Sequence, residues 1–148
     1  MVIVMKEYYV FEVKKEFINL YREKTSELFY IYNRIYNMKE VDKMYGYNLF
    51  DQISKFHNKK NINDYIYDIY KDKITYAFTE DEHVINNLFS GEISILKVKN
   101  SCLKIETNTD DCSFFKDLKA YNNNFFVCSF KEQEYFFLKN YRHHVKSM

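Results

Sequence analysis

The stretch that decides the fold is KEYYVFEVKKEFINLY, residues 6–21. In residues 6–13 both sets of alternating side chains are largely apolar, which is typical of a strand covered on both faces. From Lys15 onward the apolar residues follow helical spacing instead. The stretch therefore predicts a doubly covered strand that runs directly into a helix.

This helix carries more apolar surface than a short helix needs to dock on a core. Phe17 and Tyr21 are spaced i, i+4 and can point away together as an aromatic ridge, while Ile18 and Leu20 dock on the sheet. Aromatic side chains of this kind are enriched in protein interfaces. The alternative is that all four side chains belong to the core, and the pattern alone allows both arrangements.

The next part of the chain is predicted to be helical. SELFYIYNRIYN, residues 26–37, places its apolar residues on one stripe, and Thr25 or Ser26 is expected to cap it. A weaker helical region begins at Asp42 and is interrupted by Gly46. An Asn-rich loop or cap then precedes a short helix over residues 64–72.

The C-terminal part alternates strands with helices. Residues 73–79 read as a strand, and EDEHVINNLFSG, residues 80–91, as a helix with an acidic first turn and a Gly stop. Residues 92–107 and 124–140 are predicted hairpins that flank a helix over 110–121, with Asp110 as its cap.

These elements predict an α+β fold in a single domain over residues 1–148. An N-terminal strand and a helical half pack on a mostly antiparallel sheet, into which the first strand is expected to insert.

Composition restricts the function classes. The 22 basic and 21 acidic residues give a net charge of +1, without the basic surplus of a dedicated duplex-DNA binder. The apolar start MVIVMKEYYV is too short for a signal peptide, and no apolar run approaches the ~18 residues of a membrane span. Three scattered cysteines fit reduced thiols, so a cytoplasmic protein is expected.

Enzyme and cofactor signatures are weak. The chain has two glycines, Gly46 and Gly91, and therefore cannot contain a Gly-rich phosphate-binding loop. The cysteines form no C-x-x-C pair, and His143 and His144 are adjacent, so neither a metal nor a cofactor is expected. His83, in the first turn of the predicted helix, is either an acid–base residue or part of a solvated capping cluster. No motif supports an enzyme.

One region allows a different function. KFHNKKNINDYIYDIYKDK, residues 55–73, interleaves basic and aromatic side chains, as single-strand nucleic-acid-binding modules do. Asp64, Asp68 and Asp72 recur along the same helix and would repel phosphate. A solvated helix is therefore the competing interpretation of this region.

Two stretches resemble a known family. YYVFEVKKEFINLYREKTSELF, residues 8–29, is similar to its opening strand and Glu-Phe helix, and residues 95–140 are similar to its closing hairpins and Phe-Phe helix. The chain departs from the family at EYFFLKN, residues 134–140, where Tyr-Gly-Trp-Leu is common. On these motifs the chain resembles the SirA family, the sporulation inhibitors of replication of spore-forming bacteria.

The resemblance implies a non-enzymatic inhibitor that binds the N-terminal domain of the replication initiator DnaA. The family's partner-facing Phe and Tyr correspond to Phe17 and Tyr21, and a further Tyr in the following helical region corresponds to Tyr47. The resemblance thus favours the aromatic ridge over the core arrangement. It implies a protein partner, with no cofactor, no membrane and no direct contact with nucleic acid.

Overall fold

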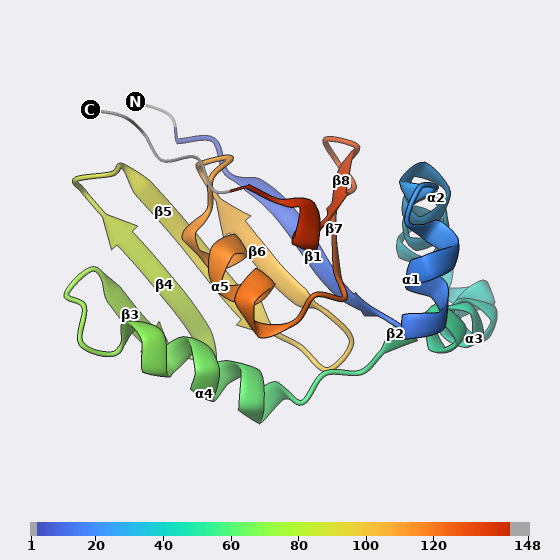
Figure 1. Cartoon of the computed structure of the whole chain (residues 1–148), viewed down its shortest axis with the longest axis horizontal. Coiled ribbons are helices and arrows are strands. Elements are labelled where there is room, and N and C mark those ends of the chain that lie inside the picture. Colours follow the sequence, from blue (N-terminus) through green and yellow to red (C-terminus); the bar gives the residue numbers. More distant parts are fainter. Residues whose placement is uncertain (1–2, 143–148) are drawn as a thin grey trace.

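The N-terminal strand lies inside an eight-stranded sheet in the computed structural model, which describes residues 3–142 (Figure 1). The strands are β1 (Lys6–Val13), β2 (Ser54–Lys55), β3 (Tyr76–Thr79), β4 (Glu82–Asn87), β5 (Glu92–Val98), β6 (Leu103–Thr107), β7 (Phe125–Ser129) and β8 (Glu134–Phe137). Their order is β3-β4-β5-β6-β1-β7-β8, β2 pairs with β1, and neighbours run antiparallel. The predicted α+β class and the insertion of the first strand are confirmed.

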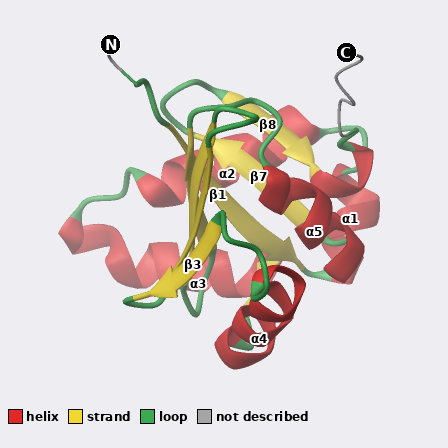
Figure 2. Cartoon of the chain, turned by 90° about the vertical axis from the view of Figure 1, so that its left-hand side faces the viewer, coloured by secondary structure: helices red, strands yellow, loops and turns green. Residues whose placement is uncertain are grey.

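The helices lie on both faces of this sheet. They are α1 (Lys15–Tyr21), α2 (Thr25–Tyr36), α3 (Lys43–Ile53), α4 (Lys59–Tyr70) and α5 (Ser113–Tyr121), with short 3-10 turns η1 (Glu40–Asp42) and η2 (Leu138–Asn140). Figure 2 shows α4 and α5 on one side of the sheet and α2 and α3 on the other. Helix α1 sits with α2 and α3 beyond the β7–β8 end (Figure 1).

The protein has two hydrophobic cores, one on each face of the sheet. Strand β1 contributes side chains to both, as its two apolar faces predict. Tyr8 and Val10 enter the front core under α4 and α5, where the Tyr8 ring meets Phe115 edge-on at 5.3 Å. Phe11 and Val13 enter the back core under α2 and α3, where the Phe11 and Tyr32 rings stack at 4.1 Å. Because alternate side chains leave a strand on opposite faces, one strand ties both layers together.

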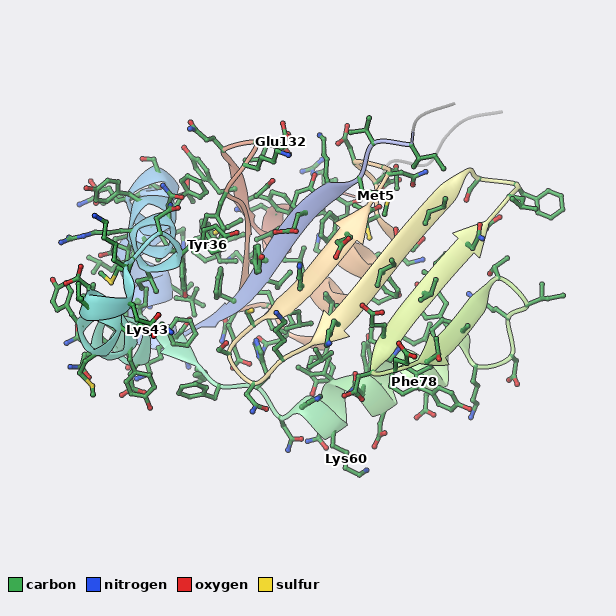
Figure 3. All side chains as sticks on the ribbon, turned by 180° about the vertical axis from the view of Figure 1, so that it is seen from behind. Met5, Tyr36, Lys43, Lys60, Phe78 and Glu132 are labelled. Carbon is green, nitrogen blue, oxygen red and sulfur yellow. The ribbon has the colours of Figure 1, made fainter. Side chains whose placement is uncertain are left out.

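When the sheet is viewed from behind, no helix of residues 3–142 lies in front of strands β4, β5 and β6 (Figure 3). Val84 and Ile95 are half-buried on this face, and Lys104 lies 3.5 Å from Glu7 and 3.7 Å from Glu106. Apolar and charged side chains are mixed there, as on an antiparallel sheet with one solvated face.

The helix predicted over residues 80–91 is wrong. Residues 82–87 form β4, which pairs with β3 on one side and with β5 on the other. Glu80 and Asp81 form a two-residue turn with positive φ values of 52° and 65°, the backbone of a tight hairpin. Ile85 is buried, and pairing on both edges outweighed the acidic pattern that suggested a helix start.

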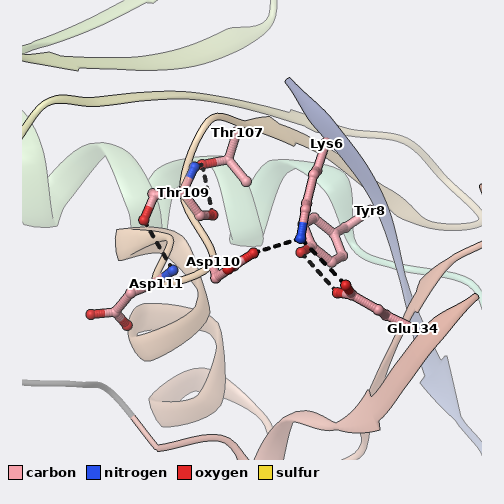
Figure 4. A network of polar contacts seen from close by, with 7 residues as sticks. All are labelled: Lys6, Tyr8, Thr107, Thr109, Asp110, Asp111 and Glu134. Carbon is pink, nitrogen blue, oxygen red and sulfur yellow. Dashed lines mark hydrogen bonds and ion pairs between the residues drawn. The ribbon is translucent and has the colours of Figure 1, made fainter. Parts of the chain in front are cut away.

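The prediction that Asp110 caps the helix over 110–121 is also wrong. Asp110 is drawn into a polar network in which it accepts a 2.7 Å hydrogen bond from Lys6, whose ammonium also lies 3.3 Å from Glu134 (Figure 4). Chiefly through its bond to Asp110, this network raises the pKa of Lys6. Helix α5 is capped from strand β5 instead: the buried Glu92 carboxylate accepts from the Ser113 backbone N–H at 2.9 Å.

Two other helix starts differ from the predictions. Helix α2 begins at Thr25 without a side-chain cap, so neither Thr25 nor Ser26 acts as one. Helix α4 begins at Lys59, earlier than residue 64, because the Asn58 side chain accepts from the Asn61 backbone N–H at 3.1 Å.

Candidate functional site

Helix α1 covers the edge of the back core with one half-buried face. Phe17, Ile18 and Tyr21 pack against the back core, whereas Leu20 is 54% exposed. The prediction that Leu20 docks the helix is therefore wrong, and Ile18 docks as expected. Positions i, i+1 and i+4 share one side of a helix, and Leu20 lies off that side.

Phe17 and Tyr21 lie together, as their spacing predicts. Their ring centroids are 6.4 Å apart with planes inclined by 21°. Both rings line a cavity of about 210 Å³ between α1, α2 and α3, which we name the helical cleft. The other lining residues are Tyr30, Ile31, Arg34, Leu49, Gln52 and Ile53.

The helices that form the walls of the helical cleft are anchored to the back core and to the sheet. Tyr32 of α2 is buried, and its hydroxyl lies 2.5 Å from the Ser54 hydroxyl of β2. Burial raises the pKa of Tyr32, so this phenol stays neutral. At the start of α1 the Lys14 backbone N–H donates to the Ile53 carbonyl at 2.8 Å. These bonds tie α1, α2 and α3 to β1 and β2, so the cleft is held in shape by packed elements.

Tyr47 does not line the helical cleft. It is 56% exposed on α3, and its ring lies 6.3 Å from that of Phe56. Two residues along a helix turn a side chain through about 200°, so Tyr47 points away from Leu49, which does line the cleft. The structure thus brings Phe17 and Tyr21 together and leaves Tyr47 on a neighbouring surface.

Sequence reasoning missed the part of the cleft contributed by α2 and α3. Tyr30 and Arg34 are exposed, stand one helical turn apart on α2 and line the cavity together with Leu49 of α3. Their i, i+4 spacing was visible in the sequence, but the packing partner of α2 was not.

His83 is a buried structural residue. It lies on β4 with 0% exposure; its Nδ1 is 2.7 Å from the Tyr76 hydroxyl and its Nε2 is 2.8 Å from the Asn63 side-chain oxygen. Burial, partly offset by Asp81, lowers the pKa of His83 to about 4. The predicted place in a helix and the solvated capping cluster are both wrong, because the strand turns the ring inward against α4.

The other titratable candidates are also structural. Cys102, Cys112 and Cys128 are buried free thiols, and burial raises the pKa of Cys112 to about 12. Cys128 fills core space, as predicted. Buried His57 lies 3.8 Å from Glu12 and lowers the pKa of that carboxyl.

Within residues 3–142, no group of three His, Cys, Asp or Glu side chains could hold a metal ion. His143 and His144 lie outside the described residues. No helix in the described part of the chain is long and apolar enough to cross a membrane.

The lysines of the basic region at 55–73 are largely paired with carboxylates, some from the region itself and some from elsewhere in the chain. Lys59 lies 3.1 Å from Asp81, and Lys60 of α4 lies 2.7 Å from Asp64. Figure 3 shows Lys60 and Phe78 on the same side of the molecule. Phosphate binding would have to compete with these ion pairs, so the region offers little free positive charge.

Fold and site together define an α+β protein with an aromatic cleft built from three helices. Residues 6–142 match the family model described as sporulation inhibitor of replication protein SirA, and the chain therefore belongs to the SirA family. The family description makes it an inhibitor of replication in sporulation. A comparison with curated proteins finds no match.

Proposed function

We propose that this chain inhibits the initiation of DNA replication by binding the N-terminal domain of the initiator DnaA through the helical cleft. The observation that carries the proposal is that Phe17 and Tyr21, which correspond to the family's partner-facing residues, line one cavity. The inhibitor would act in the cytoplasm, without catalysis, by occluding a surface that the initiator needs for assembly.

The partial burial of Phe17 and Tyr21 supports the proposed contact. Phe17 and Tyr21 are half-buried, so each is held in place by the back core and still presents ring surface to a partner. Preorganised aromatic side chains lose little conformational freedom on binding and are frequent hot spots. Tyr47 is proposed as a contact at the margin, reached if the interface extends over α3.

Binding of the purified N-terminal domain of DnaA by calorimetry tests the proposal. Tyr21→Ala is expected to weaken binding by about 2 kcal/mol or more. It should cost about 1 kcal/mol of stability, because the ring is half-buried. Tyr67→Ala on α4 is the matched control, since Tyr67 is an exposed tyrosine outside the cleft.

Two outcomes would contradict the proposal. Wild-type protein that forms no complex with the domain at concentrations on the order of tens of micromolar would exclude this partner. Equal weakening by Tyr21→Ala and Tyr67→Ala would place the interface away from the helical cleft.

A further inference from the structure

A second cavity adjoins the helical cleft and has a different chemistry. It has a volume of about 640 Å³ and shares Tyr30 and Arg34 with the helical cleft. Its remaining wall is mostly polar and includes Asn33, Asn37, Lys39 and Asp42. Tyr30 and Arg34 therefore stand at the junction between an aromatic depression and a polar one.

Arg34 is an exposed cation at this junction and has no carboxylate partner in the part of the chain that the structure describes. Its guanidinium carbon lies 5.8 Å from the Tyr45 ring centroid. Among the described residues it forms no ion pair, although Lys43 close by is paired with Glu40 at 2.8 Å. Tyr30 and Ile31 stand one turn before Arg34 on α2, and Asn37 and Met38 follow just beyond the end of the helix; none of the four is acidic.

Among residues 3–142, no carboxylate forms an ion pair that would compensate the positive charge of Arg34. Asp42 lines the second cavity together with Lys39, but it makes no ion pair with Arg34 within the described chain. The Tyr45 ring face can hold the guanidinium by a cation–π contact. A guanidinium held in this way keeps N–H donors free for a bidentate carboxylate.

We propose that Arg34 is a specificity-determining residue, which selects a protein partner that presents an apolar side chain to the helical cleft and a carboxylate beside it. The inference rests on the proposed function only for the identity of the partner. The charge argument depends on this chain alone, because Arg34 lines the aromatic cleft and forms no ion pair within residues 3–142. A partner without the carboxylate would leave Arg34 partly desolvated and unpaired, which is unfavourable.

Two small probes test the chemistry independently of the partner. We expect 3-phenylpropionate to bind the wild-type protein more tightly than the neutral 3-phenylpropan-1-ol, by about fivefold or more in NMR titrations. Arg34→Gln should abolish this preference. Arg22→Gln should keep it, because Arg22 lies outside both cavities and its guanidinium donates to Asn19 at 2.9 Å. Equal affinity of the wild-type protein for the two probes, or a preference that survives in Arg34→Gln, would overturn the proposal.

Binding of the DnaA N-terminal domain separates this inference from the proposed function. Arg34→Glu is expected to weaken the complex by about tenfold or more at low salt and by less at high salt. A wild-type complex that Arg34→Glu leaves intact would refute the role of Arg34 and leave the proposed function standing. A wild-type protein that does not bind the domain would refute the proposed function, and the probe pair would still decide the role of Arg34.

Discussion

Replacing His83 should change how stability depends on pH, because the buried ring is held neutral. Its pKa falls to about 4 in the folded protein, against about 6.5 in an unfolded chain. Below pH 6.5 the unfolded state therefore binds a proton at His83 that the folded state does not bind. The contribution of His83 to the free energy of unfolding is therefore fully present above pH 6.5 and is lost as the pH falls from 6.5 toward 4.

The size of the loss follows from the two pKa values. At pH 5 the unfolded state is almost fully protonated and the folded state is largely neutral, which gives a loss of about 2 kcal/mol. Below pH 4 the loss approaches about 3 kcal/mol, at ~1.4 kcal/mol per pKa unit. The physical cause is burial, which disfavours the charged imidazolium and is only partly offset by the carboxylate of Asp81.

Urea denaturation of wild-type protein and of His83→Asn between pH 8 and pH 4.5 measures this effect. The variant is expected to be less stable at pH 8, because it packs less well, and to lose about 2 kcal/mol less between pH 8 and pH 5. Other groups titrate equally in both proteins and cancel in the difference. Parallel pH profiles, or an NMR titration of His83 near pH 6.5 in the folded protein, would refute the reasoning.

Three further predictions follow from the described contacts. Glu92→Gln should destabilise the fold by about 1–2 kcal/mol in urea denaturation, since an amide has one acceptor oxygen for the Ser113 bonds, while Glu106→Gln should have little effect. Replacing Glu80 and Asp81 by Asn and Gly should stabilise the hairpin by about 1 kcal/mol in thermal melts, because both residues have positive φ; an unchanged melting temperature would argue against strain there. Finally, we propose that residues 1–148 unfold as one domain, so circular dichroism and tyrosine fluorescence should give coincident transitions, since β1 contributes to both cores.

The inhibitor role and the architecture fit together in physical terms. His83 and the three cysteines are the side chains that acid–base or nucleophilic catalysis would use. They are buried, and burial favours their neutral forms. Aromatic side chains with accessible ring surface, among them Phe17, Tyr21 and Tyr30, instead line the helical cleft. Under the proposed function the protein acts by covering a partner, and its specificity depends on the shape and charge of a small surface.

The sequence by itself determined the elements whose signal is local. Alternation in residues 6–13 predicted a strand buried on both faces, and the same signal predicted the hairpins that contain β5–β6 and β7–β8. The i, i+4 spacing of Phe17 and Tyr21 correctly placed their rings side by side. These features depend on neighbours within one or two turns, which the sequence displays directly.

Only the tertiary structure decided what depends on distant partners. Residues 82–87 became a strand because β3 and β5 pair with both of their edges, and α5 is capped by Glu92, which stands 21 residues before Ser113. Leu20 is exposed and Tyr47 points away from the cleft, because the packing of α1 and α3 fixes their rotation. The ridge predicted from Phe17 and Tyr21 is thus one wall of a cleft that α2 and α3 complete. Long-range packing chose among arrangements that the local pattern allowed equally.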